Sequence, residues 1–125
     1  MSEPSPSLPP AAIRPPAMLL ALLLTAGLFL VGGRPEASHY FPGPAHWIAH
    51  FGTYGLIAAA YARALPRLGV LPVAALVMVI GIVHEYYEIG SHGHDFEYLD
   101  AAVNGLGALA GSFAGRISWP RRPRS

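Results

Sequence analysis

Four apolar stretches, separated by short polar segments, dominate the hydrophobic pattern of the chain. They cover about residues 17–33, 44–65, 68–88 and 98–117. An α-helix rises about 1.5 Å per residue, so about 20 apolar residues span the hydrocarbon core of a bilayer. The pattern therefore predicts an all-α protein that folds as a four-helix transmembrane bundle.

The first apolar stretch has two interpretations. Residues 17–33 contain no charge and a single hydroxyl group, which is typical of a lipid-exposed helix. Arg14 before the stretch and the small residues Ala37 and Ser38 after it also fit a cleaved signal peptide. We favour a retained helix because three more apolar stretches follow, but the sequence leaves cleavage open.

The composition agrees with a membrane protein. Charged residues make up 12% of the chain and hydrophobic residues 53%, whereas a soluble domain carries about 25% charged residues. Cysteine is absent, which excludes disulfides, thiolate metal sites and cysteine nucleophiles. The basic residues are dispersed at helix ends and in the C-terminal tail, so we expect no nucleic-acid partner.

The distribution of arginine predicts the orientation in the membrane. With four spans, seven of the eight arginines fall on the side that holds both termini, and Arg34 falls on the other side. Positive charge is enriched in cytoplasmic segments, so both termini are expected in the cytoplasm. The predicted organisation is a disordered cytoplasmic tail (1–16), a four-span membrane domain (17–117) and a basic cytoplasmic tail (118–125).

Polar side chains inside the predicted helices require partners, because an ionised group near the bilayer centre costs about 2.5–3.5 kcal/mol. Those that share a helix face or a helix end are His46, His50, Tyr54 and Tyr61 in the second helix, His84, Glu85 and Glu88 in the third, and Asp100 and Asn104 in the fourth. Counting from the helix ends places polar residues of all three helices at a similar depth, in one polar layer near the outer surface.

We therefore predict a candidate polar site at this layer. Its residues are, in order of preference, His50, Glu85, Asp100, Asn104, Tyr54, Glu88 and His94. His50 and Glu85 are expected to form a charged or proton-sharing pair, oriented by Asp100 and Asn104. For a lone residue such as Asn104, a structural hydrogen bond between helices is the more common role.

The fourth helix also carries a small-residue pattern. Gly107, Gly111 and Gly115 follow one another at intervals of four residues on one face. Such spacing lets two helices approach closely. We favour helix packing within one chain, and leave open contacts between chains and a homo-oligomer.

Three motifs occur in order along the last three predicted helices. They are His50-Phe51-x-x-Tyr54, Glu85-x-x-Glu88 and His94-Asp95-Phe96-Glu97-Tyr98-Leu99-Asp100-x-x-x-Asn104-x-x-Gly107-Ala108-x-x-Gly111. In this order and spacing, over about residues 44–116, the chain resembles the VanZ-like family of small bacterial membrane proteins.

The resemblance implies a multi-pass protein of the bacterial inner membrane, related to one that contributes to resistance against the glycopeptide antibiotic teicoplanin. It implies no particular reaction. The chain departs from the family pattern at His94, where Arg is usual, at Glu88, where Gln is usual, and near Trp47, where a Lys often precedes the histidine. These departures make the outer site more acidic.

Three functions fit these observations. The first is a non-catalytic protein of the cell envelope that binds membrane lipids or a lipid-linked envelope component at the outer polar site, with no metal and no cofactor expected. The second is an intramembrane hydrolase or transferase that uses a histidine and carboxylates as acid and base. The third, which we rank last, is a small transporter in which Glu85 and Asp100 carry protons.

The second function includes a variant with a divalent metal. The residues able to supply ligands are His46, His50, Glu85, Glu88, His92, His94 and Asp100. The similarity of His84-Glu85-x-x-Glu88 to the zinc-protease motif is only partial, because the second histidine of that motif is absent.

Overall fold

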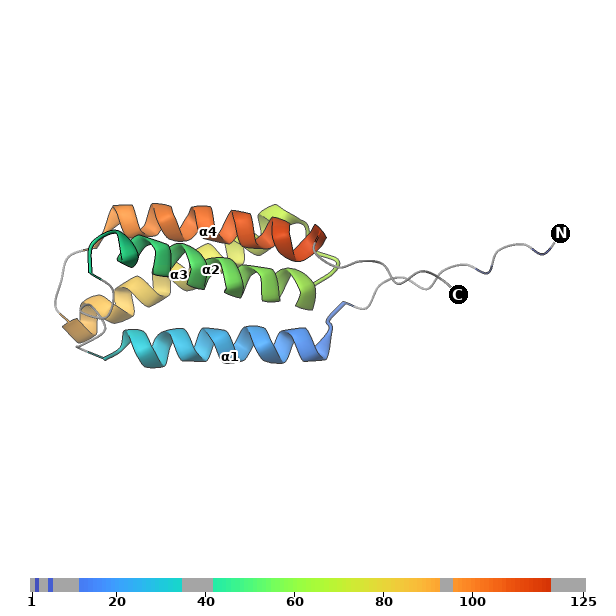
Figure 1. Ribbon diagram of the computed structural model, residues 1–125. Helices are drawn as coiled ribbons and strands as arrows, with labels where there is room; N and C mark the ends of the chain where they lie inside the picture. Colours follow the sequence, from blue (N-terminus) through green and yellow to red (C-terminus); the bar gives the residue numbers. More distant parts are fainter. Residues whose placement is uncertain (1, 3–4, 6–11, 35–41, 93–95, 118–125) are drawn as a thin grey trace.

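Four helices account for most of the described residues (Figure 1). The computed structural model describes residues 2, 5, 12–34, 42–92 and 96–117. The helices are α1 (Pro15–Gly32), α2 (Pro44–Ala64), α3 (Val70–His92) and α4 (Tyr98–Ile117), and the described residues contain no strand. The prediction of an all-α chain with four helices is confirmed.

Proline and glycine define the start of the first two helices. α1 begins at Pro15 and α2 at Pro44, where the missing proline N–H leaves no hydrogen bond unmade. Gly43, before α2, adopts a φ of 63°, a left-handed conformation that glycine accepts without steric cost. α3 continues to His92, beyond the end predicted near Glu88.

α2 and α4 pack backbone to backbone along the three glycines of α4, which we call the glycine stripe (Gly107, Gly111 and Gly115). A Cβ atom added at Gly107 would lie 3.1 Å from the Cα of Phe51, and one at Gly111 would lie 2.7 Å from the Cα of Gly55. The equivalent atom at Gly115 would lie 2.9 Å from the Cα of Ala59. The stripe therefore serves contact between two helices of the same chain.

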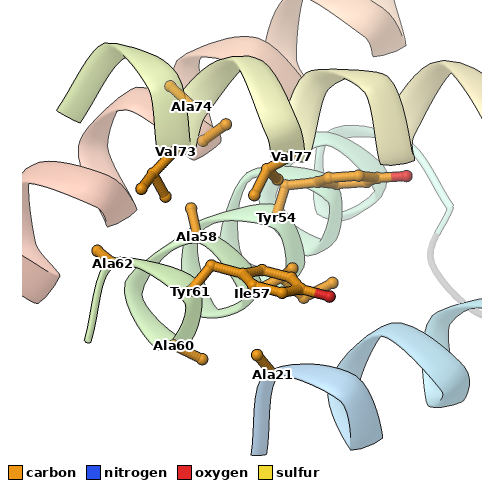
Figure 2. Close-up of a cluster of buried hydrophobic side chains, with 11 residues drawn as sticks. Ala21, Tyr54, Ile57, Ala58, Ala60, Tyr61, Ala62, Val73, Ala74 and Val77 are labelled. Carbon is orange, nitrogen blue, oxygen red and sulfur yellow. The ribbon is translucent and has the colours of Figure 1, made fainter. Parts of the chain in front are cut away.

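The bundle core is formed mainly by α2 and α3 (Figure 2). Its largest fully buried apolar side chains are Tyr54, Ile57, Val73 and Val77. α1 reaches this core through Ala21, which is fully buried, and through Thr25, whose Oγ1 lies 3.0 Å from the Tyr61 hydroxyl.

The outward face of α1 is apolar. Five of its exposed residues are leucines, each more than half exposed: Leu19, Leu20, Leu22, Leu23 and Leu30. Among the described residues, α1 and the stretch Val70–Gly90 of α3 are long and apolar enough to cross a membrane. α2 and α4 are less apolar because they carry polar and small residues on the faces that meet each other.

Candidate functional site

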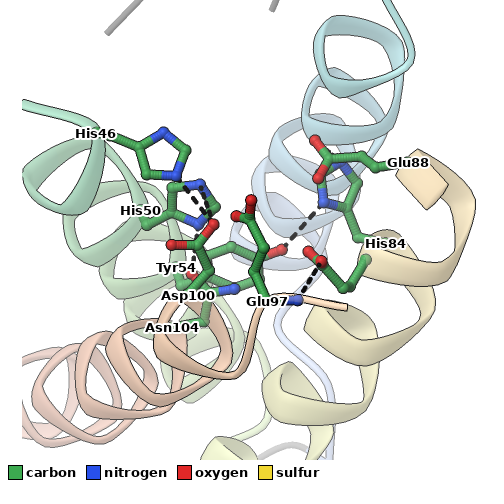
Figure 3. Close-up of polar contacts among 9 residues, drawn as sticks. His46, His50, Tyr54, His84, Glu88, Glu97, Asp100 and Asn104 are labelled. Atoms are coloured by element: carbon green, nitrogen blue, oxygen red, sulfur yellow. Dashed lines mark hydrogen bonds and ion pairs between the residues drawn. The ribbon is translucent and has the colours of Figure 1, made fainter. Parts of the chain in front are cut away.

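Four polar side chains from α2 and α4 meet at one end of the bundle (Figure 3). Nε2 of His46 lies 2.9 Å from Oδ2 of Asp100, and Nδ1 of His50 lies 2.8 Å from Oδ1 of Asn104. Nε2 of His50 lies 3.9 Å from the same Asp100 oxygen. We name His46, His50, Asp100 and Asn104 the α2–α4 site.

Helix geometry explains why these four residues meet. His46 and His50 are one turn apart on α2, and Asp100 and Asn104 are one turn apart on α4, so each pair projects from one face of its helix. The close backbone contact of the glycine stripe starts less than one turn beyond Asn104, at Gly107. The two polar pairs are therefore near enough to bond directly.

The hydrogen bonds determine where the ring protons lie. The amide oxygen of Asn104 only accepts, so Nδ1–H of His50 donates to it. In a neutral His50 ring the lone pair is then on Nε2, the nitrogen that faces Asp100. Since the Asp100 carboxylate also accepts, Nε2–H of His46 donates to it.

An open pocket of about 750 Å³ adjoins the α2–α4 site. It is lined by residues 42–44, 46–47 and 97–100. The side chain of His46 is 34% exposed, whereas that of Asp100 is 7% exposed. A molecule that entered the pocket would meet His46 at the edge and Asp100 at the base.

Three acidic residues lie close together near the base of the pocket. The side chain of Glu97 lies within interacting distance of the Asp100 carboxyl group. The backbone N–H of Glu97 donates to Oε1 of Glu85 over 3.1 Å. Glu97 therefore links Asp100 to Glu85, although it was not among the predicted site residues.

The predicted pair of His50 and Glu85 is wrong. Glu85 is 5% exposed and accepts a hydrogen bond from the Glu97 backbone, while His50 bonds to Asn104 and faces Asp100. The reason is the close packing of α2 on α4, which places the polar start of α4 against the histidines of α2. Glu85 nevertheless lies near the predicted polar layer, since it lines a small cavity together with Asn104.

A second polar cluster lies between α1, α2 and α3. Nε2 of His84 lies 3.2 Å from the carbonyl oxygen of Leu28, which only accepts, so this nitrogen carries the proton. Nδ1 of a neutral His84 then accepts from the Tyr54 hydroxyl over 3.3 Å. Nε2 also lies 3.7 Å from Oε1 of Glu88. We name His84, Tyr54 and Glu88 the His84 cluster.

The predicted site residues thus fall into two groups and a remainder. His50, Asp100 and Asn104 belong to the α2–α4 site, and Tyr54 and Glu88 belong to the His84 cluster. Glu85 lies near Asn104, and His94 lies outside the described residues.

Two histidines of these clusters were not predicted as site residues. The sequence places His46 on the same helix face as His50 and among the possible metal ligands, and in the structure its Nε2 lies 2.9 Å from Oδ2 of Asp100. The sequence feature that indicates a site role for His46 is its spacing of four residues from His50, which places the two imidazoles on successive turns of one helix face. The sequence places His84 one turn before Glu88, but its bonds to Tyr54 and to the Leu28 carbonyl depend on how α1 and α2 pack on α3.

Comparison of the chain with models of protein families, with curated proteins and with solved structures gives no match. The class of protein is therefore defined by the fold and the site alone. It is an all-helical protein with two helices apolar enough to cross a membrane and a histidine–carboxylate site at one end of α2 and α4.

Proposed function

We propose that the protein is a four-span membrane protein of the VanZ-like kind that binds the headgroup of a lipid or lipid-linked envelope component. The observation that carries the proposal is the convergence of His46, His50 and Asp100 beside an open pocket. Resistance or tolerance to a teicoplanin-type antibiotic is the phenotype that the family resemblance suggests for such binding.

Helix length supports four spans. α2 has 21 residues and α4 has 20, which corresponds to about 30 Å each and matches the hydrocarbon core of a bilayer. The histidines of α2 face Asp100 and Asn104 of α4, and this is how polar groups are accommodated in membrane helices. α1 and α3 supply apolar faces of similar length.

The distribution of charge supports an outer location for the site. Arg63, Arg67 and Arg116 lie at the end of the bundle opposite Asp100 and Glu97. Arginine is enriched on the cytoplasmic side of membrane proteins. The α2–α4 site is therefore placed, in this proposal, at the extracytoplasmic surface, with both termini in the cytoplasm of a bacterial cell.

The pocket supports binding of a headgroup. Its volume of about 750 Å³ lies in the range of small-molecule sites, which is about 300–1,000 Å³. Trp47 and Tyr98 supply aromatic surface on its wall, while His46 and Asp100 supply polar atoms. Aromatic residues with one apolar and one polar end are typical of the membrane interface, where lipid headgroups lie.

The proposal is tested by the lipids that the protein retains. We would reconstitute the full chain in nanodiscs of phosphatidylethanolamine, phosphatidylglycerol and undecaprenyl phosphate, and identify the retained lipids by native mass spectrometry. His46→Ala is expected to weaken retention of at least one species about tenfold, because a lost hydrogen bond to a charged group costs about 1.5–3 kcal/mol.

The matched control for this experiment is Ile48→Ala. Ile48 is 72% exposed and lies two residues from His46 on α2, but it does not line the pocket. Its substitution is expected to leave lipid retention unchanged. Equal retention of every lipid by the wild type and by His46→Ala would contradict the proposed function.

A further inference from the structure

We propose that His46, His50 and Asp100 bind one zinc ion. One ligand nitrogen from each histidine and one oxygen of Asp100 lie within 4.8 Å of one another. Zinc binds histidine nitrogen and carboxylate oxygen at about 2.0–2.2 Å, so small side-chain rotations suffice for the three donors to surround an ion. The inference deepens the proposed function and rests on it for the role of the site, and it departs from the expectation of a metal-free site.

The orientation of His50 is the first argument. Its Nδ1–H donates to Asn104 over 2.8 Å, which directs Nε2 and its lone pair toward Asp100. Histidines that bind a metal almost always donate their other ring N–H to a carbonyl or carboxylate, because this bond fixes the tautomer and the ring orientation. Asn104 supplies that partner to His50.

The relation of His46 to Asp100 is the second argument. A single proton occupies the 2.9 Å space between Nε2 of His46 and Oδ2 of Asp100. Zinc would take the place of that proton, which moves to Nδ1 of His46 or to solvent. Both ligand atoms then bind the metal in the deprotonated form that coordination requires.

The local charge is the third argument. Asp100, Glu97 and Glu85 lie close together, and the described residues that line the pocket include no Arg and no Lys. Among the described residues, the groups that act on Asp100 as cations are His50 and His46. A divalent ion would offset this negative charge, and it would provide the positive charge with which a phosphate headgroup interacts.

The open pocket is the fourth argument. Three protein ligands leave the fourth position of tetrahedral zinc available for water or for an oxygen of a bound molecule. His46 borders the pocket and is one-third exposed, so this position faces the accessible side of the site. The pocket also gives the ion a path of entry.

The inference is tested by titration of the metal-free protein. The full chain would be purified in detergent with a tag that lacks histidine, treated with EDTA, and titrated with zinc chloride by isothermal titration calorimetry. We expect one zinc per chain and an affinity at least about tenfold lower in His46→Ala and in Asp100→Asn. Because His46 is partly exposed, its variant is expected to remain folded, which circular dichroism would verify.

Two control variants test the assignment of the ligands. Glu88→Gln replaces a carboxylate of the His84 cluster and is expected to leave zinc binding unchanged. A triple replacement of His39, His92 and His94 by asparagine is also expected to leave zinc binding unchanged. Magnesium should not bind, because it prefers an all-oxygen, octahedral set of ligands.

Either of two results would overturn the inference: folded wild-type protein that takes up no zinc, or uptake that His46→Ala and Asp100→Asn leave unchanged. The lipid experiment separates this failure from failure of the proposed function. Lipid retention that depends on His46 and persists in EDTA, without zinc binding, would contradict the metal site alone. Zinc binding without selective lipid retention would contradict the headgroup function alone.

Discussion

Gly111→Val is expected to lower the free energy of unfolding by about 3 kcal/mol, because it forces the backbones of α2 and α4 apart. A Cβ atom at position 111 would overlap the carbonyl oxygen of Gly55 and lie 2.7 Å from its Cα. Both of these are backbone atoms, so no side-chain rotation relieves the overlap. Thermal unfolding in detergent, followed by circular dichroism, measures the effect.

Gly52→Val is the matched control for this substitution. Gly52 lies in α2, and a Cβ atom there would meet nothing within 4 Å. The two variants share the same change in intrinsic helix propensity, so the difference between their unfolding temperatures isolates the contact between α2 and α4. Equal unfolding temperatures would show that the two helices do not approach closely at Gly111.

His84→Ala is expected to destabilise the bundle by about 3 kcal/mol and to loosen α1 in particular. His84 is 3% exposed and bonds to Tyr54 in α2 and to the Leu28 carbonyl in α1. Its removal leaves a buried hydroxyl and a carbonyl without this partner, each at a cost of about 1–3 kcal/mol, and creates a cavity as well. The ring of Phe29 also loses its T-shaped contact with the imidazole ring, whose centroid lies 5.1 Å away.

Hydrogen exchange measured by mass spectrometry tests the effect of His84→Ala on α1. Amide exchange in α1 should accelerate more than exchange in α4, which contacts α2 through the glycine stripe instead. Val83→Ala is the control, since Val83 precedes His84 in α3 but is 53% exposed. Exchange in α1 that is the same in both variants would contradict the role of His84.

The helices were predictable because their signals are local. Pro44 at the start of α2 and the polar start of α4 at Tyr98 both lie where the sequence places them. The end of α3 was less predictable, since the helix continues past Glu88 through residues 89–92. Apolar periodicity does not report how far a helix extends beyond the buried region.

The pairing of polar side chains was not predictable, because it depends on how each helix is rotated in the bundle. His84 and Glu85 are neighbours in sequence and therefore about 100° apart on α3. α3 packs with Gly81 against the ring of Tyr54, where an added Cβ would lie 3.1 Å from its Cε1. In this rotation His84 faces α1 and α2, and Glu85 bonds to Glu97 at the start of α4.

The choice of partner for His50 depends on the distance between helices. The sequence indicates that His50, Asp100 and Asn104 lie at similar depth, but it does not indicate which two helices are closest. The glycine stripe decides this, because it brings the backbone of α4 against that of α2. A glycine face predicts close approach to some helix, whereas the identity of that helix emerges only from the complete packing.

Cysteine accessibility in spheroplasts of a bacterial host tests most directly the central claim, that the α2–α4 site lies at the extracytoplasmic surface. The chain has no cysteine, so Ala45→Cys, next to His46, and Leu68→Cys, at the opposite end of the bundle, each introduce a single thiol. Both positions are exposed. We predict that a membrane-impermeant maleimide labels Ala45→Cys in intact spheroplasts and labels Leu68→Cys only after the membrane is permeabilised. The reverse pattern, or equal labelling of both variants before permeabilisation, would contradict the claim.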